Sequence, residues 1–305
     1  MSLAVIILTL NEERHIARAL TSVASIASEL FVVDSFSTDR TVELARNHGA
    51  TVVQHPFVNH AKQFQWALDT LPITADWIMR LDADEVVEPD LVRRLHDELP
   101  ALPNDVVGIM LKLKIIFQGR WIRYGGRYPL LLLRIWRRGH GRMADRWMDE
   151  HMVVWGGRMV TLEGGISDHN LNDLTFFTNK HNKYATREAI DVVNQHRHLF
   201  PREVGSSGPG QSSVQTALKL FIKERIYNRI PYLISAPAYF LYRVILRFGF
   251  LDGKEGIVYH YLQALWYRLL VGAKVDELER ALTGVEDPAA MRAEIQRLTG
   301  FALEP

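Results

Sequence analysis

The sequence predicts an α/β protein with a doubly wound, mostly parallel sheet and a helical extension toward its C-terminal end. Within about the first 100 residues, short apolar runs alternate four times with segments of helical periodicity, which is the pattern of repeated βα units. Polar residues follow three of these apolar runs. Beyond residue 213 the chain becomes rich in basic and aromatic residues, which indicates a segment of different character.

The composition limits the class of protein. A chain of 305 residues is long enough for one large α/β domain, or for a domain with an appendage. Hydrophobic residues make up 48% and charged residues 23%, which is typical of a globular protein with a full-sized core. The net charge of +1 excludes a general preference for polyanions. The absence of cysteine excludes disulfides and thiolate metal sites, and it is compatible with a reducing compartment.

The first third of the chain accounts for the alternating pattern. Continuous apolar runs are typical of parallel strands that are covered on both faces. The expected strands are 4–8, 30–34, a short one within 49–57, and 77–81, and the expected helices are 12–30, 41–48, 61–71 and 89–99. Because ligands bind at the carboxyl ends of the strands in such sheets, the polar residues that follow these strands are candidates for one site.

The pattern changes after about residue 104. Longer strands are expected at 106–117 and 130–136, and short strands at 152–154 and 159–162 flank the sequence WGGR, which predicts a hairpin. The chain turns helical from Leu174, and a Gly/Ser/Pro-rich linker is expected at 201–213. The sequence therefore predicts a main domain at 1–200 with halves 1–103 and 104–200, the linker, and an extension at 214–305.

The acidic sequence DADE at 82–85 stands where the fourth strand is expected to end. Neighbouring carboxylates repel one another, and a divalent cation would offset this repulsion. Mg²⁺ and Mn²⁺ prefer oxygen ligands and often bind through one or two carboxylates together with substrate phosphates. The alternative is a set of acids that open a helix, where negative charge is favoured. The position at a strand end favours a metal that holds a diphosphate.

Two common nucleotide-binding motifs are missing. No G-x-G-x-x-G follows the first strand, and no G-x-x-x-x-G-K-[ST] occurs anywhere in the chain. Both Rossmann dinucleotide binding and P-loop phosphate binding therefore lose support.

Three other motifs occur in order: TLNEE at 9–13, VVDSFSTDRT at 32–41 and RLDADE at 80–85. With these motifs, residues 1 to about 190 resemble the family 2 glycosyltransferases of the GT-A fold, a Rossmann-like α/β fold. The resemblance implies an inverting enzyme that transfers a hexose from a UDP-sugar. It also implies that residues 1–103 bind the nucleotide sugar and that residues 104–200 bind the acceptor.

The resemblance implies donor-binding roles at the strand ends. Thr9, Asn11 and Glu12 would line the nucleoside pocket. Asp34 would accept a hydrogen bond from the base, which we expect to be uracil. The further implied donor contacts are Ser35, Asp39, Lys62 and Asp82. Two of these residues have other interpretations, because Lys62 fits a solvated helix position and Glu12 fits an acid at a helix start.

The resemblance also implies a metal site and a general base. Asp84 would bind the metal, with Asp82 and His169 as further ligands. Inverting transfer needs a base near the acceptor hydroxyl, and Glu150 is the first candidate, since a Glu-His pair before an apolar strand resembles the family pattern. Asp149 is the second candidate, and a solvated loop acid is the alternative for at least one of the two.

The segment 214–274 contains nine basic and three acidic residues, a local charge of +6, with aromatic residues between the bases. This pattern favours attachment to an anionic membrane surface, and packing on the main domain or on a second subunit is the alternative. No nucleic-acid module is present, so we expect no nucleic-acid partner. The segment resembles those of bacterial enzymes that build lipopolysaccharide core or exopolysaccharide repeat units, which implies a lipid-linked glycan acceptor.

The expected location follows from the hydropathy. The apolar stretch near the N-terminus lacks a basic leader and predicts a core strand rather than a signal peptide. No uncharged run reaches the ~18–20 residues that span a bilayer. We therefore expect a cytoplasmic protein on the inner face of the cytoplasmic membrane.

Two other functions fit parts of the sequence. A sugar nucleotidyltransferase on a similar fold would favour a G-x-G-x-x-x-R-like stretch after the first strand, and this stretch is absent. A membrane scaffold that has lost activity is disfavoured by the acids retained at Asp34, Asp82, Asp84 and Glu150.

Overall fold

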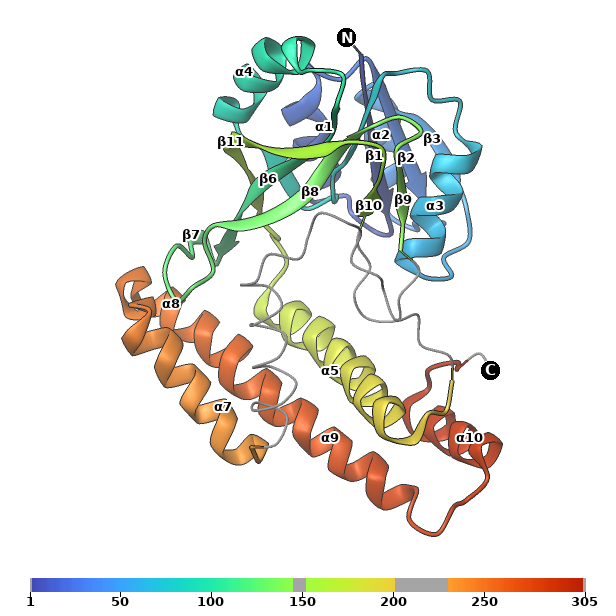
Figure 1. The fold of residues 1–305 in the computed structure, drawn as a ribbon, viewed down its shortest axis with the longest axis vertical. Helices are drawn as coiled ribbons and strands as arrows, with labels where there is room; N and C mark the ends of the chain where they lie inside the picture. The colour runs from blue at the N-terminus through green and yellow to red at the C-terminus, as the bar shows by residue number, and fades with distance from the viewer. Residues whose placement is uncertain (1, 145–151, 201–229, 304–305) are drawn as a thin grey trace. The chain divides into compact units, whose positions relative to one another are not determined.

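The computed structural model describes residues 2–144, 152–200 and 230–303. The contacts divide them into two compact units (Figure 1). The first unit contains residues 2–144 and 152–171, and the second contains residues 172–200 and 230–303. The candidate linker at 201–213 and residues 214–229 lie outside the described residues, as do Asp149 and Glu150.

Among the described residues, nine strands form the sheet of the first unit. Along the sheet they are β3 (Thr51–Gln54), β2 (Glu29–Asp34), β1 (Leu3–Thr9), β4 (Trp77–Arg80), β8 (Leu130–Arg137), β6 (Val106–Phe117), β11 (Arg158–Asp168) and β5 (Glu85–Val87), with β7 (Arg120–Trp121) paired to β6. The first four are mutually parallel, as the alternating pattern predicts. Strand β8 runs antiparallel to both β4 and β6, so the whole sheet is mixed.

Helices cover both faces of the parallel half. On one face, α1 (Ile16–Val23), α2 (Thr41–Asn47) and α4 (Pro89–Glu98) pack against alternate residues of β1, and the short helix η1 (Leu99–Ala101) follows α4. On the other face, α3 (His60–Thr70) packs against the remaining residues of β1 and β2. Burial on both sides explains why the strands are continuous apolar runs rather than alternating ones.

The helix predicted at 12–30 is shorter than expected. It ends at Val23, because Glu29 already pairs with Ala4 in the β1–β2 ladder and Ser28 donates a backbone hydrogen bond to the carbonyl of Leu3. A long apolar periodicity therefore hid the turn and the first residues of β2.

The hairpin predicted around WGGR is wrong. Strand β10 (Met152–Val154) pairs with β9 (Gly141–Met143) in a separate two-stranded sheet, whereas β11 pairs with β6 and β5. The backbone at Gly157 explains the difference. A Cβ there would lie 2.2 Å from the carbonyl oxygen of Asp105, and the next amide, of Arg158, donates to that oxygen at 2.8 Å. This close approach directs the chain onto the edge of β6.

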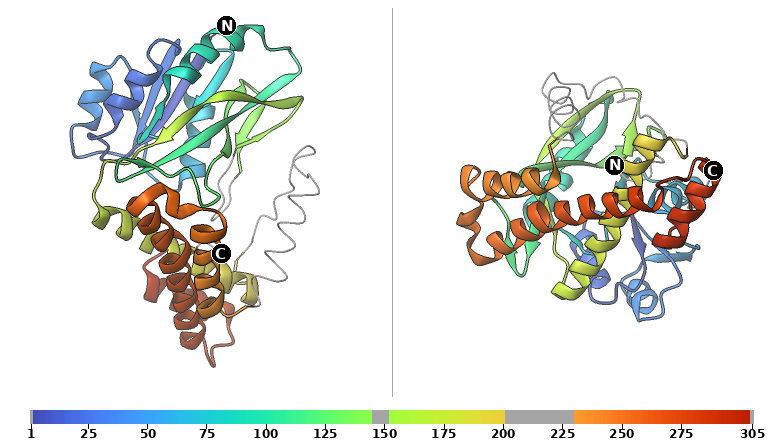
Figure 2. Two further views of the ribbon diagram at one scale, coloured as in Figure 1. Left: turned by 90° about the vertical axis from the view of Figure 1, so that its left-hand side faces the viewer. Right: turned by 90° about the horizontal axis from the view of Figure 1, so that it is seen from below.

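The second unit is helical. The long helix α5 (Leu174–Arg197) lies beside α9 (Tyr267–Ala281), and α10 (Pro288–Thr299) completes their apolar core (Figure 2). Between residues 232 and 266 the chain forms α7 (Tyr232–Leu241), η3 (Tyr242–Leu246), η4 (Gly249–Asp252), α8 (Gly253–His260) and η5 (Tyr261–Trp266). The units divide after Leu171, so α5 groups with the C-terminal helices, earlier than the predicted boundary at residue 200.

Candidate active site

Arg134 lies where β4 ends, and it offsets the charge of the acidic turn. It belongs to β8, the neighbour of β4, and only 5% of it is exposed. Its Nη2 donates to Oδ2 of Asp82 at 3.1 Å and to Oε1 of Glu85. On the other side, Nε of Arg80 donates to Oδ1 of Asp82 at 3.2 Å. The protein therefore supplies its own counter-charges for Asp82 and for the buried Glu85.

The pKa values of the partly exposed Asp82 and the buried Glu85 are shifted in opposite directions. Burial raises the pKa of Glu85 to about 8 against the opposing charge of Arg134, and the charge of Asp82 adds to this rise. Burial alone would also raise the pKa of Asp82, but Arg134 and Arg80 outweigh it and hold that pKa well below its usual range. The two arginines therefore stabilise the ionised form of Asp82.

Asp84 is tied to the end of β11. Its carboxylate accepts a hydrogen bond from Nδ2 of Asn170 at 2.9 Å, and its carbonyl accepts one from the amide of His169 at 3.0 Å. The pairing of Asp168 with Glu85 brings the two segments together. The structure thus brings Asp84 and His169 together, and it adds Asn170, which the sequence analysis missed although it directly follows His169.

Arg18, on α1, holds the imidazole of His169. Its Nη2 donates to the carbonyl of His169 at 2.8 Å, and its Nη1 lies 3.3 Å from Nδ1. Burial, and then the positive charge of Arg18, lowers the pKa of His169, so the ring is neutral at pH 7. Because a guanidinium only donates, Nδ1 is the acceptor and Nε2 carries the proton. Metal binding by either nitrogen would require Arg18 to move away.

These residues test the predicted metal site. Within residues 2–144, 152–200 and 230–303, no three acidic, histidine or cysteine side chains are close enough together to hold a metal ion. Both oxygens of Asp82 face guanidinium groups, so metal binding there would have to displace an ion pair. The carboxylate of Asp84 is partly exposed. These residues fit a cation that is held by Asp84 and whose remaining ligands are substrate phosphates and water. They do not form a complete metal site by themselves.

Asp34 is the centre of the loops that follow β1 and β2. It is fully buried, and its carboxylate accepts hydrogen bonds from Oγ1 of Thr9 (3.1 Å), the amide (2.9 Å) and hydroxyl (2.5 Å) of Ser37, and Nε2 of Gln54 (3.1 Å). A carboxylate has about four acceptor positions, so the protein already occupies them. A hydrogen bond from a nucleobase to Asp34 would have to displace one of these donors.

The two loops are also bound to each other. Asn11 has a left-handed backbone (φ 56°), and its Oδ1 accepts from the amide of Thr38 at 2.9 Å. Asp39 accepts from Thr41, at 2.5 Å from the hydroxyl and 3.0 Å from the amide, and from the amide of Glu13 at 3.1 Å. The motifs TLNEE and VVDSFSTDRT, separate in sequence, therefore form one structure.

Glu12 is connected to the segment that follows β11. Nε2 of the buried His15 accepts the amide of Leu171 at 2.9 Å, so its Nδ1 carries the ring proton and donates to Oε2 of Glu12 at 2.5 Å. Nothing in the sequence marks His15 beyond its place in the first helix. The contact explains how the TLNEE turn is held close to the segment that carries His169.

Ser35 and Lys62 are placed by α3. Its N-terminus is capped by Asn59, whose side chain accepts the amide of Lys62 at 2.7 Å, while the Lys62 side chain is exposed. The next residue, Gln63, is buried and donates to Oγ of Ser35 at 2.8 Å. Gln63 is a further residue that the sequence analysis missed.

Two apolar side chains are exposed beside the same loops. Leu10 is 51% and Phe36 is 53% exposed, and Phe36 adopts a left-handed backbone (φ 61°) that is uncommon for a bulky residue. They provide apolar surface at the carboxyl ends of β1 and β2, where a nucleobase could pack.

Comparison with known proteins identifies the family. The family model described as glycosyl transferase family 2 matches residues 4–170. The chain belongs to this family. An uncharacterized glycosyltransferase of Rickettsia felis is 41% identical over 210 residues, which cover 63% of this chain and 71% of that protein. A counterpart in Rickettsia conorii is 40% identical over the same shares.

The chain is thus a glycosyltransferase with the predicted GT-A type of α/β fold, and the nucleotidyltransferase alternative is disfavoured. Among solved structures, the glucosyl-3-phosphoglycerate synthase of Mycobacterium tuberculosis, in complex with Mn²⁺ and UDP-glucose, is 24% identical with a TM-score of 0.31. That match spans 37% of this glycosyltransferase and 43% of the synthase chain.

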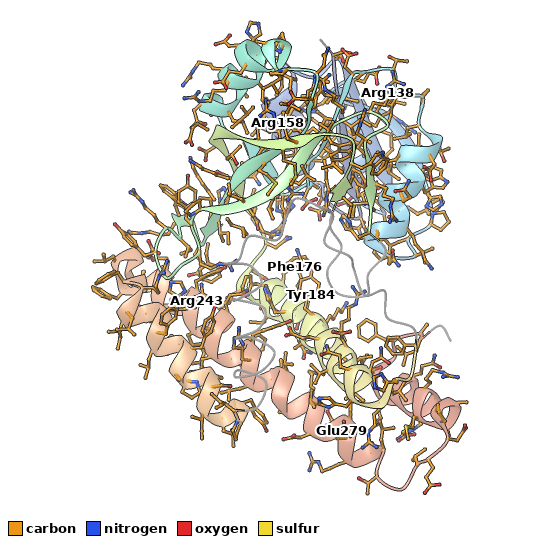
Figure 3. The ribbon with its side chains drawn as sticks, viewed as in Figure 1. Arg138, Arg158, Phe176, Tyr184, Arg243 and Glu279 are labelled. Carbon is orange, nitrogen blue, oxygen red and sulfur yellow. The ribbon has the colours of Figure 1, made fainter. Side chains whose placement is uncertain are left out.

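The ion pairs of Arg134 predict a large stability effect. Arg134→Met would leave Asp82 and Glu85 without their shared counter-charge, and losing one partner of a buried pair costs about 3–5 kcal/mol. Urea denaturation should show this loss. Arg158, which pairs with Asp105 at an exposed site (Figure 3), provides the control, because Arg158→Met should leave the midpoint unchanged. Equal midpoints for the two variants would contradict the role given to Arg134.

The four donors around Asp34 generate a second prediction. Asp34→Asn replaces one acceptor oxygen with an amide that only donates, so at least one buried donor loses its partner. We expect the free energy of unfolding to fall by about 1–3 kcal/mol, measured by chemical denaturation. Asp97→Asn, at an exposed carboxylate of α4, is the matched control. If Asp34→Asn is as stable as that control, Asp34 does not organise the loops.

Proposed function

We propose that this glycosyltransferase is an inverting, metal-dependent enzyme that moves a hexose from a UDP-sugar to a lipid-linked glycan, either lipopolysaccharide core or a polysaccharide repeat unit. The main support is the position of Asp84. It lies at the carboxyl end of β4, beside the ends of β1 and β2, and Asn170 and His169 connect it to the end of β11. In parallel sheets this edge is where nucleotide ligands bind.

The donor would lie along the loops after β1 and β2. We assign the direct contacts to Asn11, Ser35, Asp39 and Lys62, which are partly or fully exposed, with Leu10 and Phe36 against the base. Thr9, Glu12 and Asp34 are engaged inside the loops, so we propose that they shape the pocket. Preformed loops lower the entropy cost of ordering the donor.

Asp84 is the residue that we propose as the main ligand of Mg²⁺ or Mn²⁺. A cation held there would neutralise the charge that develops on the departing diphosphate. We propose that Asp82 orients the turn through Arg80 and Arg134. His169 would be an additional ligand only if Arg18 leaves its ring, since Arg18 lies 3.3 Å from Nδ1.

The base would be Glu150, with Asp149 as the second candidate, and this assignment rests on the sequence pattern. In the inverting reaction, the carboxylate takes the proton of the acceptor hydroxyl while that oxygen forms a bond to the anomeric carbon. The bond from that carbon to the diphosphate oxygen breaks, and its electron pair leaves with UDP. One displacement at one carbon inverts its configuration.

The acceptor and the location are also proposals. A lipid-linked acceptor would hold the enzyme at the inner face of the cytoplasmic membrane, and the +6 charge of residues 214–274 supports attachment to anionic lipid. The alternative is that the C-terminal helices form a homo-oligomer instead of binding a membrane. No partner of nucleic acid is proposed.

The metal assignment predicts how UDP binding depends on Asp84. Asp84→Asn should bind UDP in Mn²⁺ no better than the native enzyme binds it in EDTA, because the charged ligand of the cation is gone. Isothermal titration calorimetry with and without Mn²⁺ measures this difference. Asp97→Asn should keep the native metal dependence. Native UDP affinity of Asp84→Asn in Mn²⁺ would refute the assignment.

The base assignment predicts a separation of binding from transfer. Glu150→Gln keeps the size of the side chain but removes the proton acceptor, so transfer should fall by about 10²–10⁴-fold while UDP affinity stays native. Product formation on a lipid-linked acceptor and calorimetry provide the two measurements. A fully active Glu150→Gln would move the role of base to Asp149, and the same loss of activity in Asp149→Asn would then identify Asp149 as the base.

A further inference from the structure

Residues 230–261 expose an unusual number of large apolar side chains. Leu233, Ile234, Ile245, Leu246, Phe248 and Phe250 are between 46% and 68% exposed. They lie on α7, on the short helices η3 and η4, and at Phe248 between these two, along the segment that leads into α8 (Figure 1). We call residues 241–251 the elbow. A patch of this kind marks a surface that is covered by a partner or by a membrane.

Polar side chains of the same segment point inward. Arg243 and Asp252 are each 3% exposed, and His260 is fully buried. The guanidinium of Arg243 lies 5.7 Å from the ring centroid of Tyr239 and 5.8 Å from that of Tyr259, on the segment between α7 and α8 (Figure 3). Arginine, aspartate and histidine are buried here, while leucine and phenylalanine are exposed. This is the reverse of the usual distribution of side chains in a protein surrounded by water. This reversed order suits an apolar surrounding.

The backbone of the elbow is hydrogen-bonded within the segment. The amide of Arg247 donates to Tyr242 at 2.9 Å, that of Phe248 to Ile245 at 3.2 Å, and that of Leu251 to Phe248 at 3.0 Å. In hydrocarbon no water is present to satisfy amides and carbonyls. These three amides of the elbow are therefore satisfied without water, although the elbow is not a single straight helix.

The exposed charges identify the kind of membrane. Along residues 230–261, which the structure describes in full, the exposed charged side chains are Arg247 and Lys254. Lys254 lies 3.7 Å from the carboxylate of the partly buried Glu255. Each basic residue near an anionic leaflet contributes attraction. No helix in the described part of the chain is by itself long and apolar enough to cross a bilayer. Tyr232–Leu246 and Gly249–Ala281 meet that test only as a pair, with a bend of 73° at the elbow.

We propose that the elbow inserts into one leaflet of an anionic membrane and that the chain enters and leaves on the same side. Leu246, Phe248 and Phe250 would lie in the acyl region, with Arg247 and Lys254 at the headgroups. This inference deepens the proposed membrane-bound acceptor by naming the residues that hold the enzyme at the membrane. Binding of UDP in solution is independent of it.

The lack of cysteine allows a direct test on the full chain. Leu246→Cys carries one environment-sensitive fluorophore, and Leu298→Cys, at an exposed leucine of α10, carries the same label as the control. With vesicles containing phosphatidylglycerol, the label at 246 should shift to shorter wavelength and be quenched by nitroxides on the acyl chains. The label at 298 should do neither, and neutral phosphatidylcholine vesicles should give a weaker response at 246.

Two outcomes would overturn the proposal. A label at 246 that stays in water with anionic vesicles excludes insertion. A label that is already shielded without vesicles, together with a dimer in sedimentation velocity, shows that a second copy covers the patch. In vesicle flotation, Leu246→Glu should reduce membrane binding at least about tenfold, since it removes a leucine that would be buried in the acyl region. Leu298→Glu should not reduce it. Native UDP affinity in both variants separates this result from a failure of the donor site.

Discussion

The ion pairs of Arg134 determine how the acidic turn after β4 can be used. The guanidinium comes from β8 and donates to both the partly exposed Asp82 and the buried Glu85, which makes it possible to bury the carboxyl group of Glu85. These two acids already have a protein counter-charge, which is why we propose Asp84 as the carboxylate that serves a ligand. The repulsion that the sequence seems to build into this turn is thus offset from within the sheet, and a cation is needed only where the substrate brings further negative charge.

Acidic side chains at the neighbouring strand ends are likewise bound by other groups of the protein. Asp34 accepts hydrogen bonds from Thr9, Ser37 and Gln54, and so fixes the two loops in one conformation. Asp39 and Asn11 then connect these loops to each other. The buried Asp34 thus shapes the carboxyl edge of β1 and β2, which we call the rim. The exposed polar and apolar groups of the rim would remain available to the donor. A rim that is shaped before the donor arrives is what positioning a reactive sugar requires.

Local patterns predicted much of this. Strands β1, β2, β4 and β6 follow the apolar runs almost residue for residue, and the three motifs do meet at one edge. The partners that fix the side chains could not be predicted, because Arg134, His15 and Gln63 carry no local signal and act over long separations in sequence. The hairpin prediction at WGGR failed for a similar reason. A glycine is needed at position 157 because the backbone approaches Asp105 closely, and not because the chain forms a hairpin there. The basic-aromatic segment was visible, but its reversed burial was not.

We propose that Asp84 holds the cation while Asp82 stays paired with Arg134. Crystals grown with UDP and Mn²⁺ test it directly through the anomalous signal of manganese. We expect one peak at the carboxyl end of β4, in contact with Asp84 and the diphosphate, with the Asp82–Arg134 pair intact. A peak bound by Asp82 after it has left Arg134, or UDP bound at the rim with no manganese beside Asp84, would contradict it.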